Sequence, residues 1–290
     1  MAQIYIKTFN YLSIKELFWL PITHKRNKNG IFAIMFRYFI YLSYDGSNYH
    51  GWQVQPNGIT VEETLEKALS LLLHTPIDVT GAGRTDAGVH ARVMVAHFDV
   101  AEQLHFPLDA HQLAYRLNKM LPRDISISRI LPVSTDLHAR FSATRRTYHY
   151  YIHTEKDPFQ RAYSHEIHYT LDFDKMNRAA QKLIGMHDFK CFCKAGSDVK
   201  TTLCDLYEAH WDTKDGHSWC FTISANRFLR NMVRAVVGTL VEVGRGRMTL
   251  KQFEQVLNGG SRSDAGESMP GHALFLWDVA YDADNAHKNG

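Results

Sequence analysis

The alternation of apolar and polar residues along this chain predicts a series of β-strands. Residues 36–44 alternate in this way and are rich in aromatic and β-branched side chains, which favour extended structure. Similar segments predict further strands at 77–80, 93–100, 125–133, 145–153, 219–225 and 274–281. Within 145–153 the alternation places Tyr148 and Tyr150 on one face of the strand and Tyr151 on the other.

Apolar residues at helical spacing predict helices between these strands. One helix follows Thr60, which is suited to cap the third amide, with Glu63 reaching back to complete a capping box. Other helices are predicted at 113–120, 173–184 and 227–243.

The order strand–helix–strand, followed by antiparallel segments, occurs twice along the chain. It predicts an α+β fold in which two α/β-sandwich halves share a continuous, mainly antiparallel sheet, with a cleft between them. We expect an N-terminal domain at 35–140, a C-terminal domain at 141–283 and a tail at 284–290. Residues 1–34 are expected to be an extension, with Met35 as the physiological start.

Composition is that of a globular protein. Of the 290 residues, 45% are hydrophobic and 22% charged, which is typical of a chain that buries a sizeable core. The net charge is only +3, so a nucleic-acid partner would have to be bound by a local cluster of cations. No secretory signal is visible, and the apolar segment 31–43 is short and interrupted by Arg37. We therefore expect a cytoplasmic protein that does not bind a membrane.

The cysteines give no indication of a metal site. The four of them, at 191, 193, 204 and 220, contain no Cys-x-x-Cys pair. This spacing argues against zinc and favours reduced cysteines in or near the core. His90 follows Asp86 by four residues, but these two side chains are too few for a metal site. We therefore predict no bound metal.

The most unusual segment is 81–91, Gly-Ala-Gly-Arg-Thr-Asp-Ala-Gly-Val-His-Ala. Its three glycines permit positive φ and close approach of a large ligand, which suits a loop that presents Arg84 and Asp86. A phosphate-binding loop would need Lys-Ser or Lys-Thr after Gly88, and a dinucleotide fingerprint would need glycine in place of Asp86. Both nucleotide sites are therefore disfavoured. A tight turn capped by Asp86 is the structural alternative.

Residues 83–90, Gly-Arg-Thr-Asp-Ala-Gly-Val-His, resemble the signature loop of the TruA family of tRNA pseudouridine synthases. Four other segments are similar to motifs of this family, in the same order along the chain: Tyr44–Gln53, His138–Tyr148, Asn226–Arg234 and Leu274–Leu276. The five motifs together cover roughly residues 36 to 282. The resemblance implies the pseudouridine synthase fold, with a central active-site cleft.

The resemblance also implies a reaction. The family converts uridine to pseudouridine at positions 38, 39 and 40 of the tRNA anticodon stem-loop. Asp86 would be the nucleophile that attacks C6 of the base or C1′ of the ribose, after which the uracil turns and rejoins the ribose through C5. Because the product is an isomer of the substrate, no metal, nucleotide or other cofactor is implied. The family also implies a homodimer in which one tRNA contacts both subunits.

By the same resemblance, four further residues surround Asp86. Arg234 would pair with Asp86 and keep it ionised. Tyr148 would stack on the target uracil, with removal of the C5 proton as a further role. Arg84 would help to flip the uridine out of the stem, and Leu276 would wall the uracil pocket. The ordinary alternatives are a surface cation for Arg84 and core packing for Tyr148 and Leu276.

The predicted helix 227–243 has an apolar face, and its arginines lie on the opposite side. With Arg234 assigned to Asp86, Arg227 and Arg230 would be free to bind phosphates; a solvated basic face is the alternative. Further candidate phosphate contacts are Lys119, Arg123, Arg129, Arg140, Arg145 and Arg146.

Two other functions stay open. The first is a catalytically silent RNA-binding protein of the same fold, against which the complete set of Asp86, Tyr148 and Arg234 argues. The second is a nucleotide-dependent enzyme that uses the glycine loop, against which the missing Lys-Ser/Thr argues.

Overall fold

The computed structural model describes residues 23–26, 32–101, 108–194, 196, 199–213 and 215–282. The tail expected at 284–290 lies outside these residues, as does most of the extension expected at 1–34. No helix within the described ranges is long and apolar enough to cross a membrane.

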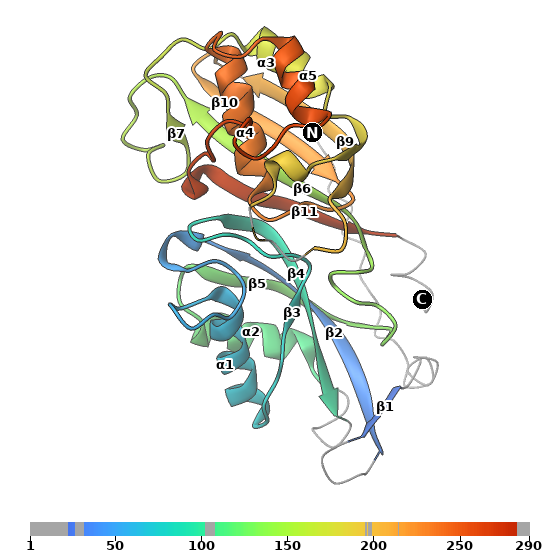
Figure 1. Ribbon diagram of the computed structural model, residues 1–290. Coiled ribbons are helices and arrows are strands. Elements are labelled where there is room, and N and C mark those ends of the chain that lie inside the picture. The colour runs from blue at the N-terminus through green and yellow to red at the C-terminus, as the bar shows by residue number, and fades with distance from the viewer. Residues whose placement is uncertain are drawn as a thin grey trace, which may run out of the picture.

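The elements form two halves (Figure 1). The strands of the N-terminal half are β1 (Thr23–Arg26), β2 (Phe32–Tyr44), β3 (Thr80–Gly81), β4 (His90–Ala101) and β5 (Ile125–Val133). Those of the C-terminal half are β6 (Ala143–His153), β7 (His165–Glu166), β8 (Gly185–Asp188), β9 (Leu203–Thr213), β10 (Ser218–Ala225) and β11 (Leu274–Tyr281). The N-terminal half carries helices α1 (Val61–Leu73) and α2 (Ala110–Met120), and the C-terminal half carries α3 (Phe173–Gln181), α4 (Met232–Gly244) and α5 (Leu250–Leu257).

The eleven strands form one sheet that runs through both halves. Its main path follows the order β1-β2-β4-β11-β6-β10-β9-β8, while β3, β5 and β7 pair with β4, β2 and β6. All pairs are antiparallel except β11 with β4 and β6 with β7. The predicted α+β fold with a continuous, mainly antiparallel sheet is therefore confirmed. The cleft predicted between the halves stays a prediction.

The halves meet where β11 lies beside β4 (Figure 1). Phe275 pairs with His90, and Leu276 pairs with Ala91, in a short parallel register. On its other edge β11 pairs with β6, so that Leu276 lies opposite Tyr148. The glycine loop leads directly into β4, and this junction therefore fixes the loop relative to the C-terminal half.

Most predicted elements are present, with shifted ends. The side chain of Thr60 accepts a hydrogen bond from the amide of Glu63 and caps α1 as predicted, while the carboxylate of Glu63 pairs with Lys67. The strand predicted at 77–80 is reduced to β3. Strand β4 begins three residues earlier than predicted, at His90. Strands β8 and β9 and helix α5 were not predicted, although α5 begins with a complete capping box.

The prediction of a helix over 227–243 is wrong at its start. Helix α4 begins at Met232, and Asn231 before it has φ of +65°, a left-handed conformation that ends any continuous helix from Arg227. Every residue of α4 except Arg234 and Glu242 is buried, so the helix is apolar nearly all round. Arg227 and Arg230 therefore lie in the segment between β10 and α4 and not on an exposed helical face.

We predict that Leu276→Ala lowers the free energy of unfolding by about 2–5 kcal/mol, because Leu276 is fully buried and its loss leaves a cavity at the junction. Leu71→Ala is the control, since Leu71 lies on α1 with 63% of its surface exposed and should cost about 0.5 kcal/mol or less. Equilibrium urea unfolding measures both values. Equal losses for the two variants would contradict a tightly packed junction.

Candidate active site

The loop that carries Asp86 is anchored to the surrounding backbone. Ala82 donates its amide to the carbonyl of Val95 at 2.7 Å, where the loop leaves β3. The carbonyl of Thr85 accepts the amide of Trp52 at 3.2 Å, and the Thr85 hydroxyl lies 2.9 Å from the hydroxyl of Tyr44. Because Thr85 is held on both sides, the next residue, Asp86, projects from a fixed point.

Positive φ requires glycine at two positions around this loop. Gly88 has φ of +75°, in the left-handed region that favours glycine. Gly51 has φ of +87°, and a Cβ there would clash with the carbonyl oxygen of Thr85. The expectation of positive φ is wrong for Gly81 and Gly83, which keep negative φ. Gly81 instead allows the ring of Trp52 to pack closely, since a Cβ would come within 2.6 Å of it.

An ion pair joins Asp86 to the other half of the molecule. The Nη1 atom of Arg234, in the first turn of α4, lies 3.2 Å from Oδ2 of Asp86. The Nε atom of Arg234 donates to the carbonyl of Met269 at 2.6 Å, which orients the guanidinium. The side chains are 22% and 27% exposed, so the pair is partly shielded but still accessible to a ligand. The guanidinium thus places a positive charge beside the carboxylate of Asp86.

Tyr148 lies beside this pair, in the middle of β6. It is 8% exposed, and the edge of its ring contacts Phe228 with 5.1 Å between ring centres. The pKa of Tyr148 is raised to about 12, chiefly by burial and also by the nearby Asp86 carboxylate, against the lowering effect of the Arg146 guanidinium. The phenol is therefore protonated at neutral pH. Leu276 is the partner of Tyr148 on the adjacent strand β11 and is fully buried.

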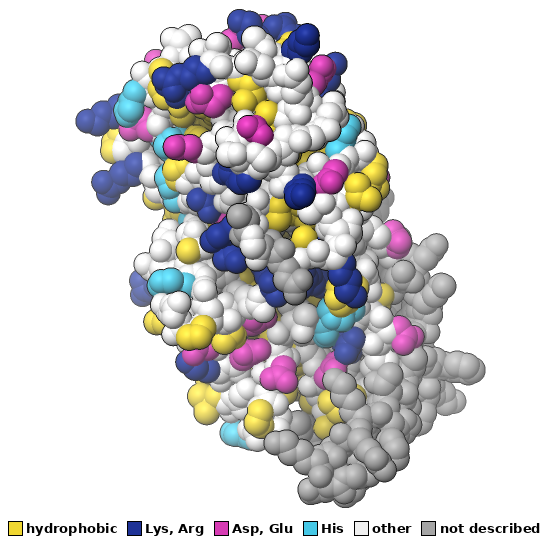
Figure 2. Space-filling model, in the orientation of Figure 1, with side chains coloured by type: hydrophobic (Ala, Val, Ile, Leu, Met, Phe, Trp, Pro, Cys, Tyr) yellow, Lys and Arg dark blue, Asp and Glu magenta, His cyan; other side chains and the backbone are white. Residues whose placement is uncertain are grey.

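Cationic side chains gather around the loop. Partial burial lowers the pKa of Arg140, and the positive charges of Arg84 and Arg227 also lower it. The three guanidinium groups therefore lie near one another. Arg84 and Arg140 are exposed, as is Arg230. Figure 2 shows Lys and Arg side chains across the middle of this face, at the level where the halves meet. A cluster of like charges of this kind attracts a polyanion.

The described residues include no group of three or more His, Cys, Asp or Glu side chains that could hold a metal ion. The four cysteines are free, and three of them are buried, as predicted. Burial raises the pKa of the Cys191 and Cys204 thiols to about 12, so both stay protonated and unreactive.

Comparison with known proteins identifies the family. A family model described as tRNA pseudouridine synthase matches residues 40–142 and 179–282. The chain belongs to the tRNA pseudouridine synthase family. A Bacteroides fragilis protein named tRNA pseudouridine synthase A is 54% identical over 245 residues, which cover 84% of this chain and 96% of that protein. Proteins of the same name from Porphyromonas gingivalis and Bacillus subtilis are 49% and 41% identical, covering 86% and 83% of this chain and 99% and 97% of their own.

Membership of the tRNA pseudouridine synthase family makes the protein an isomerase that acts on tRNA, as the resemblance implied. Among solved structures, a chain of a Cbf5–Nop10–Gar1 complex aligns at a TM-score of 0.34 and 11% identity, over 85% of this chain and 59% of that one. A likeness this weak supports no conclusion about this chain.

Not every predicted phosphate contact is available to a tRNA. Arg146 is buried, and its guanidinium donates to backbone carbonyls, so the prediction that it binds phosphate is wrong. Arg145 is exposed and lies over the ring of Tyr207 at 5.6 Å, and Arg129 lies over Tyr41 at 4.0 Å. In both, the guanidinium itself lies over the aromatic ring, as in a cation–π contact.

His90 is a site residue whose function the sequence did not reveal. It is 1% exposed at the start of β4, with Nδ1 accepting the amide of Gly46 at 3.0 Å and Nε2 lying 2.8 Å from the carbonyl of His272. This pattern requires the neutral ring with its proton on Nε2. Burial lowers the pKa of His90, and this outweighs the opposing effect of Asp45, 3.0 Å from Nδ1. His90 therefore links the loop to the C-terminal half in its uncharged form.

This state of His90 predicts a pH dependence of stability. A histidine whose pKa is lower in the folded than in the unfolded chain stabilises the fold above about pH 6.5 and loses that contribution as the pH falls. Between pH 7 and pH 5 the free energy of unfolding of His90→Gln should therefore fall less than that of the native protein. The two slopes should differ by up to about 1.4 kcal/mol per pH unit. Urea unfolding at several pH values measures this, with the exposed His111→Gln as control. An unchanged slope in His90→Gln would contradict a neutral, buried His90.

Proposed function

We propose that Asp86 is the nucleophile in the isomerisation of uridines 38, 39 and 40 of the tRNA anticodon stem-loop. The observation that carries this proposal is the ion pair of Asp86 with Arg234, next to Tyr148 at the junction of the halves. A nucleophilic carboxylate has to be ionised, oriented and accessible. Asp86 meets these conditions because its loop is anchored, its partner is a guanidinium and its side chain is 27% exposed.

The reaction conserves all atoms of the uridine. The Asp86 carboxylate attacks C1′ or C6, the bond between C1′ and N1 breaks, and the uracil turns until C5 faces C1′. The new bond joins C5 to C1′, and the bond between the Asp86 oxygen and C1′ or C6 breaks, which restores the carboxylate; C5 then loses its proton, and N1 gains one. The substrate thus supplies the atoms of the product, and the residues other than Asp86 have only to bind, orient and exchange protons.

The pKa of Tyr148 bears on its role. With a pKa of about 12, Tyr148 is almost entirely protonated at pH 7. A phenolate base for the C5 proton would therefore be scarce, and we favour stacking of the ring on the uracil. Its contact with Phe228 would keep the ring in place for this role. Leu276, beside Tyr148 on the adjacent strand, would support the ring from within the core.

The exposed arginines fit the handling of the RNA. Arg84 projects from the same loop as Asp86, two residues away, and so is suited to enter the stem and hold the flipped nucleotide. Arg140 and Arg227 lie near Arg84, and these two residues together with Arg230 would bind the flanking phosphates. Because these contacts are electrostatic, tRNA affinity should depend steeply on salt.

We also propose that the protein acts as a homodimer in which one tRNA contacts both subunits. The sheet offers a partly exposed aromatic surface on the side of β6 and β11 away from Tyr148. There His149 stacks on Trp277 with 4.2 Å between ring centres, and Arg92 lies over the same indole at 5.7 Å. Aromatic residues with arginine are typical of the centre of an interface.

The alternative functions receive less support. A catalytically silent RNA-binding protein would have no need of a carboxylate paired with a guanidinium beside a buried tyrosine. A nucleotide-dependent enzyme would place its glycine loop at the N-terminus of a helix, where backbone amides bind phosphate. Here the loop leads from β3 into β4, both of which are strands.

We predict that Asp86→Asn lowers kcat by about 1,000-fold or more while leaving tRNA affinity nearly unchanged, because the amide is not nucleophilic but fills the same space. The assay measures pseudouridine formation in unmodified tRNA transcripts, including transcripts with cytidine at position 38, 39 or 40. Asp78→Asn, at an exposed carboxylate before the loop, should keep native activity. An active Asp86→Asn variant would remove Asp86 from its role, and an inactive native protein that binds tRNA would favour the silent alternative.

A further inference from the structure

Arg146 makes an unusual set of contacts. It lies on β6 two residues before Tyr148, with 8% of its surface exposed. Its guanidinium donates to the backbone carbonyls of Asn226 at 2.7 Å, Ala143 at 2.8 Å and Ala82 at 3.0 Å, and also to that of Arg140. Each of the two terminal nitrogens of the guanidinium therefore donates to two carbonyls.

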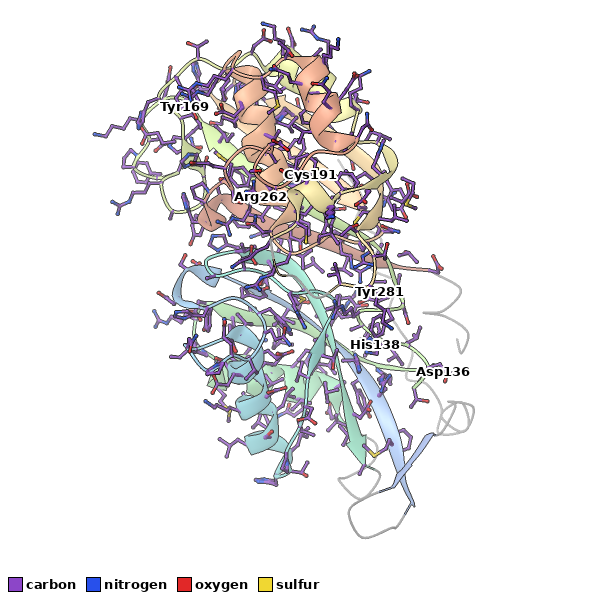
Figure 3. All side chains as sticks on the ribbon, in the orientation of Figure 1. Asp136, His138, Tyr169, Cys191, Arg262 and Tyr281 are labelled. Atoms are coloured by element: carbon purple, nitrogen blue, oxygen red, sulfur yellow. The ribbon has the colours of Figure 1, made fainter. Side chains whose placement is uncertain are left out.

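The acceptors belong to three separate segments that form the site. Ala82 begins the loop that carries Asp86, and Asn226 directly follows β10, at the start of the segment that leads to α4. Arg140 lies in the segment 134–142, which crosses between the halves, and Ala143 follows it as the first residue of β6. That segment is further fixed by Tyr281 of β11, whose hydroxyl donates to the carbonyl of Ala139 at 2.7 Å; Figure 3 labels Tyr281 near this segment.

Burial of this charge needs an explanation. Among the described residues Arg146 forms no ion pair with a carboxylate, so the carbonyl dipoles alone stabilise its charge. A buried cation is costly to desolvate, and an apolar side chain would fill the same space at less cost. An apolar side chain cannot donate hydrogen bonds to these carbonyls. It therefore cannot hold together the loop, the segment between β5 and β6 and the segment before α4.

We propose that Arg146 is a positioning residue for catalysis. It fixes the loop 82–89 against the C-terminal half, so that Asp86 stays in contact with Arg234 and beside Tyr148. Arg146 acts through the backbone of Ala82 and does not touch the uridine. The inference rests on the proposed role of Asp86 as the nucleophile.

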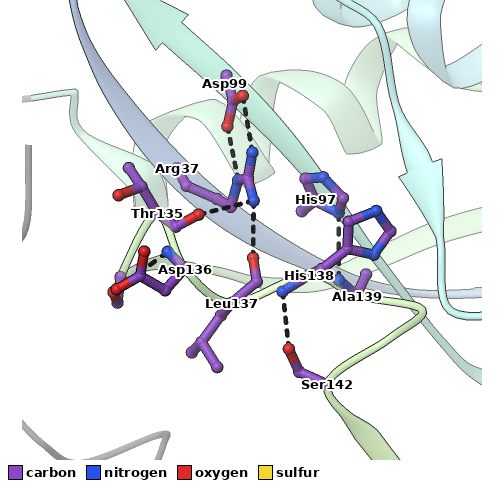
Figure 4. A network of polar contacts seen from close by, with 10 residues as sticks. Arg37, His97, Asp99, Thr135, Asp136, Leu137, His138, Ala139 and Ser142 are labelled. Atoms are coloured by element: carbon purple, nitrogen blue, oxygen red, sulfur yellow. Dashed lines mark hydrogen bonds and ion pairs between the residues drawn. The ribbon is translucent and has the colours of Figure 1, made fainter. Parts of the chain in front are cut away.

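A second, partly buried arginine network supplies the control (Figure 4). Arg37 donates to both carboxylate oxygens of Asp99, at 2.7 and 2.9 Å, and to the carbonyls of Thr135 and Leu137, each at 2.9 Å. It lies seven residues before Tyr44 on β2, about 23 Å from the end of the strand near the loop. Of the three segments that Arg146 joins, Arg37 contacts only the one between β5 and β6, through Thr135 and Leu137, so loss of its contacts should lower stability and leave the loop that carries Asp86 in place.

The experiment compares Arg146→Lys with Arg37→Lys. Lysine keeps the positive charge but cannot reach four carbonyls in a plane. For Arg146→Lys we expect kcat on unmodified tRNA to fall about 100-fold, since a shift of about 1 Å in Asp86 suffices. The Kd for tRNA should change less than about threefold, because exposed cations determine affinity. For Arg37→Lys we expect a lower melting temperature with kcat unchanged.

Three outcomes decide the matter. A loss of kcat at constant tRNA affinity in Arg146→Lys alone supports the proposal. Native kcat in folded Arg146→Lys, or equal losses in both variants, overturns it. If Arg146→Lys does not fold, Arg146→Gln takes its place with the same outcomes, because the amide keeps two N–H donors without a buried charge. Asp86→Asn assayed in parallel separates the two ideas: an inactive Asp86→Asn beside a fully active Arg146→Lys leaves the nucleophile in place and removes only the positioning role.

Discussion

The structure depends on one constraint: the carboxylate of Asp86 and the guanidinium of Arg234 come from different halves of the molecule, yet lie 3.2 Å apart. In the sheet the halves are joined by two residue pairs between β4 and β11. Further contacts must therefore fix the orientation of one half relative to the other. Nε2 of His90 donates to the carbonyl of His272 at 2.8 Å, and the hydroxyl of Tyr163 donates to Asp45 at 2.7 Å. Each contact joins the N-terminal half to the C-terminal half near the loop.

Arginine serves three physical purposes within this small region. Arg234 is partly shielded from solvent and balances the charge of the Asp86 carboxylate. Arg146 is buried and is held by carbonyl dipoles, where its geometry matters more than its charge. Arg84 and Arg140 are exposed and repel one another, which makes the surface receptive to phosphate. A net charge of only +3 for the whole chain conceals this local concentration.

The sequence was sufficient where structure follows from near neighbours. The Thr60 cap, strand β5 and strand β11 were predicted correctly because they depend on a few adjacent side chains and on alternation. The family resemblance predicts the pairing of Asp86 with Arg234, although they are 148 residues apart in the sequence. Long-range pairing of this kind cannot be obtained from periodicity.

The failures also have physical causes. The left-handed backbone of Asn231 delays the start of α4, and helical periodicity gives no sign of it. Arg146 was expected on the surface because a charged side chain usually is, and its acceptors are backbone carbonyls that no sequence motif marks. His90 was considered only as a metal ligand, whereas its two ring nitrogens bind backbone groups from both halves.

The most direct test of the account is a structure of Asp86→Asn bound to an unmodified tRNA. The account predicts a uridine of the anticodon stem flipped out of its helix, with the uracil against Tyr148 and with C1′ or C6 about 3–3.5 Å from the side chain at position 86. Arg234 should still contact that side chain. A target uridine bound far from position 86, with another carboxylate at its C1′ or C6, would contradict the central claim.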